Sequence, residues 1–182
     1  MKKIQLFISN PPGYLEEMKN QPVKTDILTF LVVILCGTLC YLTAYIIQKG
    51  YIEQVQTFDP LSVGVLILSG ISLFVVDGLF FLLIISLIEH FFVLFTERKP
   101  DYEKTLKSVI YALFIPILFL WVTGVFHIPG SIPALIAIFA VFTFYGTRAF
   151  HHLSNDRAAF VSMFTTGVIV ILLYFGHVNL IG

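Results

Sequence analysis

Apolar residues occur along this chain in long runs that are separated by short polar segments, and the lengths of the runs predict membrane-spanning helices. A helix needs about 20 predominantly apolar residues to cross the ~30 Å hydrocarbon core of a bilayer. Runs close to or above this length occupy residues 27–47, 61–95, 108–126, 132–150 and 158–175. The pattern therefore predicts an all-α, polytopic membrane helix bundle with five transmembrane helices, forming one integral membrane domain over residues 1–182.

The second run is too long for one ordinary crossing, because 35 helical residues measure ~52 Å. It is either one long tilted helix or two short helices divided near Asp77 and Gly78. With one crossing, ten of the eleven Lys and Arg residues face one side and only Lys49 faces the other. Dividing the run would put four of these residues inside and seven outside. Because positive residues are retained on the cytoplasmic side, one long helix is favoured, with a cytoplasmic amino terminus and an external carboxyl terminus.

Shorter apolar segments predict helices that lie on the membrane surface. Two of them, at residues 4–8 and 14–18, flank the Pro11-Pro12-Gly13 turn and are expected at the interface. A third is expected at residues 101–108, in the second cytoplasmic segment, where Tyr102 and Leu106 share one helical face. Pro116 falls inside the third span and is expected to kink it by removing a backbone donor.

Composition supports lipid as the outer solvent and narrows the functional classes. The chain is 58% hydrophobic and 12% charged, so it lacks the polar surface of a soluble globule. Its formal net charge is zero, which leaves no basic excess to attract nucleic acid. Cys36 and Cys40 lie in one apolar run, and two thiols supply too few ligands for a metal, so they are interpreted as small buried apolar residues.

Asp77 is the polar residue that most needs an explanation, because it lies midway along the second run. A charged group at the centre of a spanning helix costs about 2.5 to 3.5 kcal/mol on insertion scales. We expect this side chain to face the bundle. It is either a proton or cation site or a hydrogen-bonding group between helices. The second interpretation is favoured, because no other acid is predicted at a comparable depth.

A second polar group lies at the predicted cytoplasmic ends of the spans. Its candidate functional residues are Glu89, His90, Arg148, His151, His152 and Asp156. If the second and fourth spans are neighbours, Glu89 can pair with Arg148. A zinc-type site of histidines and carboxylates is the alternative, but adjacent histidines diverge by about 100° around a helix. A solvated rim with one ion pair is therefore favoured, and no metal or cofactor is expected.

Sequence motifs of catalysis are absent. The chain has no Gly-rich phosphate loop, no His-Glu-x-x-His helix and no nucleophile elbow. Five spans also do not divide into the two equal halves of an inverted-repeat transporter. The protein is therefore expected not to be an enzyme, and secondary transport is disfavoured.

Three segments carry a resemblance to a known family. They read FISNPPGYL at 7–15, TLKSVIYALFIP at 105–116 and FYGTRAFHHLS at 144–154. Together with five spans and a cytoplasmic start, they resemble the prokaryotic branch of the Ypt/Rab-interacting protein family, the Yip domain family. The resemblance implies a membrane-embedded scaffold or adaptor for trafficking, organisation or assembly, located in the plasma membrane of a prokaryote.

The same resemblance bears on partners. Eukaryotic relatives bind small prenylated GTPases through a longer amino-terminal region with an acidic, tyrosine-containing stretch. Only about 26 residues precede the first span here and they lack such a stretch, so small GTPase binding is doubtful for this chain.

Three functional hypotheses follow. The leading one is a non-enzymatic scaffold that binds membrane lipid and other membrane proteins through its helix faces, with a homo-oligomer left open. The rival is a small transporter or ion-conducting bundle that uses Asp77 as its ion site and the cytoplasmic histidine group to control access. The least favoured is a membrane enzyme with a metal held by Glu89, His90, His151 and His152.

Overall fold

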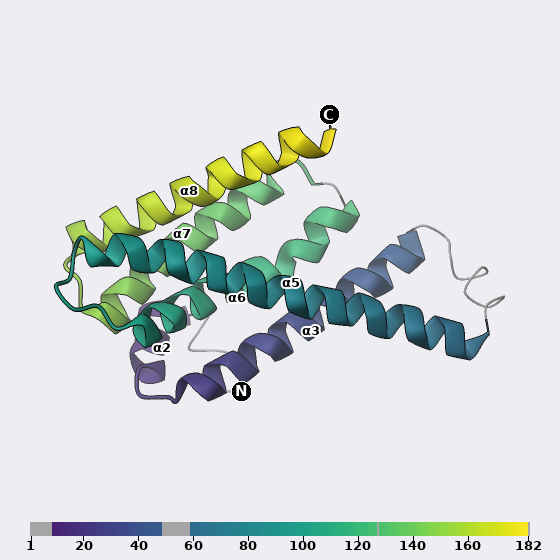
Figure 1. Cartoon of the computed structure of the whole chain (residues 1–182), viewed down its shortest axis with the longest axis horizontal. Coiled ribbons are helices and arrows are strands. Elements are labelled where there is room, and N and C mark those ends of the chain that lie inside the picture. The colour runs from purple at the N-terminus through teal and green to yellow at the C-terminus, as the bar shows by residue number, and fades with distance from the viewer. Residues whose placement is uncertain (1–8, 49–58, 127, 182) are drawn as a thin grey trace.

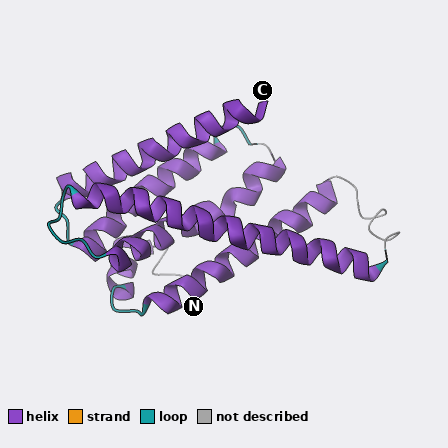
Figure 2. Ribbon diagram, viewed as in Figure 1, coloured by secondary structure: helices purple, strands orange, loops and turns teal. Residues whose placement is uncertain are grey.

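The computed structural model describes residues 9–48, 59–126 and 128–181, and within these residues the chain is helical (Figures 1 and 2). The helices are α2 (Pro11–Met18), α3 (Val23–Gln48), α5 (Pro60–Leu94), α6 (Tyr102–Phe126), α7 (Ser131–His151) and α8 (Asn155–Ile181). Five of them, α3 and α5 to α8, are long and apolar enough to cross a membrane. The predicted all-α membrane bundle with five candidate spans is confirmed.

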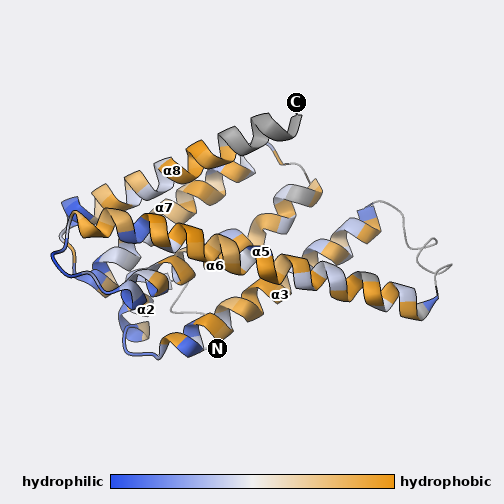
Figure 3. Ribbon diagram, viewed as in Figure 1, coloured by the Kyte–Doolittle hydropathy of each residue, from blue (hydrophilic) through white to orange (hydrophobic). Residues whose placement is uncertain are grey.

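Helix α6 is the central helix of the bundle, because it packs against α3, α5 and α7. Half of its most apolar stretch is buried, compared with 17–33% for the other four spanning helices. The outer helices expose large apolar side chains, such as Leu68 at 66% and Met163 at 72%. Hydrophobic residues colour most of the length of these helices in Figure 3, as expected for a protein whose outer solvent is lipid.

The long second run forms one uninterrupted helix, α5. Pro60 occupies the first turn, and the Asp59 carboxylate accepts hydrogen bonds from the backbone N–H groups of Leu61 and Ser62 at 2.8 and 3.1 Å. The hydrogen bond from the Ser62 hydroxyl lowers the pKa of Asp59, so the cap remains an acceptor at neutral pH. The amino-terminal end of α5 extends beyond the other helices (Figure 1).

The amino-terminal helix α2 packs against α7 at one end of the bundle. The Asn10 side chain caps it by accepting a hydrogen bond from the Gly13 N–H at 3.2 Å, and Leu15 is fully buried. This helix corresponds to the short helix predicted at 14–18. The segment predicted at 4–8 lies outside the described residues.

The segment at 101–108 differs from the prediction, because it is not a separate interfacial helix. Helix α6 begins at Tyr102 and continues through Pro116 to Phe126. Thr105, Lys107 and Ser108 are buried, since α3, α5 and α7 surround this part of α6. The sequence pattern correctly indicated helix here, but it did not show that the polar face of the helix meets neighbouring helices instead of water.

Helices α6 and α7 approach most closely at Gly146. A Cβ atom at this position would lie 2.5 Å from the Ser108 Oγ and 3.3 Å from the Ser108 Cα. Gly146 therefore allows the α7 backbone to rest directly on α6. Further along α7, the carbonyl of Ala140 accepts a hydrogen bond from the Ser162 hydroxyl at 2.6 Å, which ties α8 to α7.

Candidate functional site

Polar side chains gather where α5 ends, α6 begins, α7 ends and α8 begins. This region is the blue part of Figure 3 and is called the polar end, defined as residues 9–26, 86–111 and 145–157. Five of the predicted site residues lie in it as a group, namely Glu89, His90, Arg148, His151 and His152. Asp156 also lies there, exposed in the first turn of α8.

A chain of hydrogen bonds links four side chains across the polar end. Thr105 on α6 is fully buried, and its hydroxyl lies 3.0 Å from His90 Nδ1 on α5 and 3.0 Å from His151 Nε2 on α7. On its other side, His151 Nδ1 lies 2.8 Å from Glu97 Oε2 in the loop after α5. We call this group the histidine relay, consisting of His90, Thr105, His151 and Glu97.

The direction of these hydrogen bonds follows from the groups themselves. A carboxylate only accepts, so His151 Nδ1–H donates to Glu97, and in neutral His151 the Nε2 atom must then accept. The Thr105 hydroxyl donates to that Nε2 atom and accepts from His90 Nδ1–H. If His151 is protonated, Nε2–H donates to Thr105 instead, and Thr105 can donate onward to His90. One proton on His151 thus reverses the two bonds of Thr105.

Replacing Thr105 with Val is expected to break both histidine hydrogen bonds while preserving shape. Each buried hydrogen bond contributes about 1 kcal/mol, so the free energy of unfolding should fall by about 2 kcal/mol. Nitrogen-15 NMR of the histidine side chains should report a changed tautomer balance for His90 and His151. The Thr105→Ser variant keeps the hydroxyl and should keep the wild-type spectrum. An unchanged spectrum in Thr105→Val would mean that Thr105 does not connect the two rings.

Glu89 is completely buried on α5, with the Ser108 hydroxyl of α6 beside it. Neither of its carboxyl oxygens has a hydrogen-bond partner among the described residues. The predicted ion pair with Arg148 does not form. Arg148 is exposed on α7, where its guanidinium lies 5.7 Å from the centre of the Phe144 ring. The physical reason is that α6 contacts both α5 and α7 and separates the two side chains.

A second buried network involves Asp26, Lys107 and Tyr111. The Tyr111 hydroxyl donates to Asp26 Oδ1 at 2.6 Å, and the Lys107 Nζ lies 3.8 Å from Asp26 Oδ2. Lys107 also donates to the backbone carbonyl oxygens of Lys19, at 3.1 Å, and Gln21. These contacts fasten the loop between α2 and α3 to α6.

Sequence reasoning missed this second network. Asp26 and Lys107 fall one residue outside the predicted spans at 27–47 and 108–126; Lys107 was placed in the interfacial segment at 101–108, and Asp26 was given no role. A signal was present, because Lys107 and Tyr111 are four residues apart and share one helical face. That spacing identifies a polar face but gives no partner on another helix.

Tyr111 is also the centre of an aromatic cluster. The Tyr14 ring meets it edge-on at 5.8 Å, the Phe150 ring stacks on it at 5.9 Å, and Phe114 lies 5.0 Å away. Burial, followed by the charges of Asp26 and Glu17, raises the pKa of Tyr14, so its hydroxyl stays neutral. The three segments that carry the family resemblance thus meet around one side chain.

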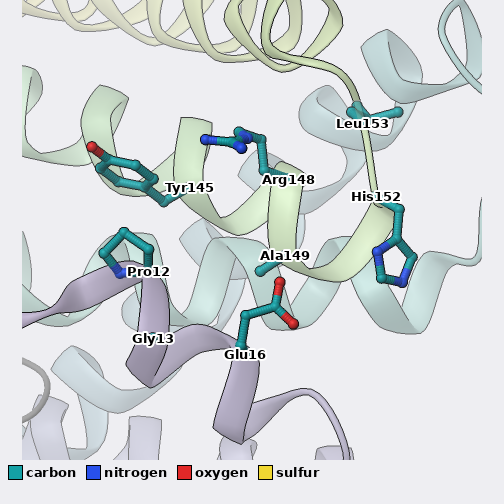
Figure 4. Close-up of a pocket in the computed structure, with 8 residues that line it drawn as sticks. All are labelled: Pro12, Gly13, Glu16, Tyr145, Arg148, Ala149, His152 and Leu153. Atoms are coloured by element: carbon teal, nitrogen blue, oxygen red, sulfur yellow. The ribbon is translucent and has the colours of Figure 1, made fainter.

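Two cavities open at the polar end. One of about 360 Å³ lies between α2 and α7, where Glu16 and Arg148 face it from opposite sides (Figure 4). The other, of about 660 Å³, is lined by residues that include Arg98, His151 and Arg157. His152 lines both cavities, and its Nε2 lies 2.6 Å from the Lys19 Nζ. Each cavity is therefore lined by both acidic and basic side chains.

Asp77 lies apart from these groups. It lines a third cavity, of about 550 Å³, between α3, α5 and α6. The structure therefore brings His90, His151, His152, Glu89 and Glu97 to one end of the bundle but does not bring Asp77 to them. In the described part of the chain, no three His, Cys, Asp or Glu side chains gather as a metal site. Cys36 and Cys40 are both exposed, so the prediction that they are buried is wrong, because the buried face of α3 runs through Ile34 and Gly37 instead.

Comparison with known proteins gives one assignment. The sequence model of the Yip1 domain matches residues 4–176, nearly the whole chain. No curated protein and no solved structure matches it. The matched region contains all five candidate spanning helices up to the last turns of α8, together with the polar end and the cavity at Asp77. The chain therefore belongs to the Yip1 domain family.

Proposed function

We propose that this protein is a non-enzymatic integral membrane scaffold that binds other membrane proteins and lipid through its helix faces. The observation that carries the proposal is the amino-terminal half of α5, which exposes large apolar side chains and whose end extends beyond the other helices (Figure 1). Leu61, Leu68 and Leu73 are 64–76% exposed there, and a Cβ atom at Gly64 or Gly70 would meet nothing within 4 Å. Small residues on an exposed apolar helix allow another helix to approach closely.

The polar end supports a structural role for its side chains. Lys107, Asp26 and Tyr111 join α3 to α6, while Thr105 joins α6 to α5 and α7. These side chains form hydrogen bonds and an ion pair with one another between helices, which supports a role in holding the bundle together. Membership of the Yip1 domain family adds to the proposal, because that family implies an adaptor in the membrane.

The proposed orientation places the amino terminus and the polar end in the cytoplasm of a prokaryote and the end of α8 outside. Its support is the distribution of positive charge, with ten of eleven Lys and Arg residues on one side of five crossings. Small GTPase binding is not part of the proposal.

Site-specific photo-crosslinking tests the scaffold. With a photoreactive amino acid at Leu68, which is 66% exposed, cells are expected to yield adducts with other membrane proteins or with a second copy of the chain. The matched control places the same amino acid at Ile85 on the same helix, which is 1% exposed and should yield none. Recovery of the chain always alone from the Leu68 position would contradict the proposal.

A second candidate function, ion or proton transport, is favoured by one observation, the position of Asp77 in an intramembrane cavity. It predicts a flux in liposomes that disappears in Asp77→Asn. Absence of proton or metal-ion flux in the wild-type protein would remove this candidate.

A further inference from the structure

The cavity at Asp77 is built by close contacts between three helices. A Cβ atom at Gly37 of α3 would lie 3.1 Å from the Ile117 carbonyl oxygen of α6. A Cβ atom at Gly78 of α5 would lie 2.6 Å from the Ile34 Cδ1 of α3. All four residues line the cavity, so these contacts fix the spacing of the helices beside Asp77. We call this cavity the Asp77 cleft.

Asp77 presents an uncompensated carboxyl to this cleft. The side chain is exposed, and no hydrogen bond or ion pair joins it to any of the described residues. It lies twelve residues along α5 from Glu89, or about 18 Å from the polar end at the rise of an α-helix. At that depth the surrounding solvent is hydrocarbon, so a positively charged group beside the carboxylate would be strongly favoured.

The remaining lining of the cleft is mainly aromatic, with Thr38, Leu120 and Thr123 beside the rings. Tyr41, Phe74, Phe81 and Trp121 all line it, and the Tyr41 and Phe74 rings lie 5.7 Å apart. The faces of aromatic rings attract organic cations, most strongly where water is excluded. A hard metal cation instead requires six or more oxygen ligands, which this lining does not supply. A site with one carboxyl group and four aromatic rings therefore favours an organic ammonium ion over a hard metal cation.

We propose that the Asp77 cleft binds a membrane-dissolved amphiphile with a cationic nitrogen, which pairs with Asp77 while its apolar tail lies along α3, α5 and α6. The volume of about 550 Å³ is sufficient for a small cationic headgroup and the first part of a chain. The proposal does not depend on the scaffold function, because pairing of an amine with Asp77 requires no protein partner, although Phe74 of the amino-terminal half of α5 lines the cleft.

The single tryptophan of the chain makes the proposal directly measurable, because Trp121 lines the cleft. The full-length protein in uncharged maltoside micelles is titrated with decylammonium and, separately, with decanol, which has the same tail without the charge. Decylammonium is expected to shift the Trp121 emission saturably and to bind about tenfold more tightly than decanol, a difference of about 1.4 kcal/mol. In Asp77→Asn this preference should disappear.

The matched control is Asp156→Asn, which removes an exposed carboxylate from the first turn of α8 and should keep the preference. A second variant, Phe81→Leu, retains the acid and should weaken decylammonium binding more than decanol binding. Equal binding of the two amphiphiles to the wild-type protein, or an unchanged preference in Asp77→Asn, would overturn the proposal. So would an emission shift produced by sodium or potassium chloride alone.

Discussion

Replacing Gly146 with Ala is expected to destabilise the bundle by about 3 kcal/mol. The new methyl group would lie 2.5 Å from the Ser108 Oγ and 3.3 Å from the Ser108 Cα. Rotation of the hydroxyl can relieve the first contact, but the second involves the backbone of the central helix, so α7 must move away from α6. Overpacking of this kind costs about 1–3 kcal/mol. Thermal unfolding in detergent, followed by circular dichroism, measures the loss.

Gly167→Ala is the matched control for that substitution. A Cβ atom at Gly167 of α8 would meet nothing within 4 Å. Ala is also about 1 kcal/mol more favourable than Gly inside a helix, so the control should unfold at the same temperature or a higher one. Adding Ser108→Gly to Gly146→Ala removes the opposing side chain and should restore part of the loss. A wild-type melting temperature for Gly146→Ala alone would refute the close approach of α6 and α7.

Replacing Lys107 with Met is expected to reduce the free energy of unfolding by about 3 kcal/mol. Met preserves the length of the side chain but leaves Asp26 buried, at 1% exposure, without its cationic neighbour. It also removes the donor that holds the Lys19 and Gln21 carbonyl oxygens. Removal of one partner from a buried ion pair costs about 3–5 kcal/mol, because the other charge is left unpaired. Thermal unfolding and protease cleavage of the loop between α2 and α3 measure the effect.

Lys24→Met provides the control, because Lys24 is an exposed lysine two residues before Asp26 on α3 and should be replaceable without loss. The Asp26→Asn and Lys107→Met double variant should be less destabilised than the sum of the two single variants, since neither charge is then left alone. Additive losses would show that the two side chains act independently.

Hydropathy and charge predicted the helical architecture because both are properties of single segments. Each span must form its own backbone hydrogen bonds within the lipid, so its length and apolar character can be read from its own residues. The treatment of 61–95 as one helix depended on counting Lys and Arg residues, and it corresponds to α5 in the structure. The segment at 101–108 was different, because whether a polar helical face meets water or other helices depends on neighbours distant in sequence.

The candidate site shows the same division. Composition identified the individual residues His90 and His151, but Thr105, which joins them, has no distinguishing pattern of its own. The Glu89 and Arg148 pair was predicted from a shared depth in the membrane, and this depth does not specify which helix lies between them. Asp26 and Lys107 were missed because the predicted spans were cut next to them. Pairing between helices depends on their azimuthal orientation, which hydropathy does not encode.

The central position of α6 has a consequence for biosynthesis. Helices α3 and α5 emerge from the ribosome first, yet most of the packing surface of α3 belongs to α6. Tyr111, which binds Asp26, follows it by 85 residues, and at about 5–20 residues per second this interval lasts roughly 4–17 s. During that time Asp26 lies at the membrane boundary without Lys107 and Tyr111. The arrival of the third span is therefore the step that commits the nascent chain to its tertiary structure.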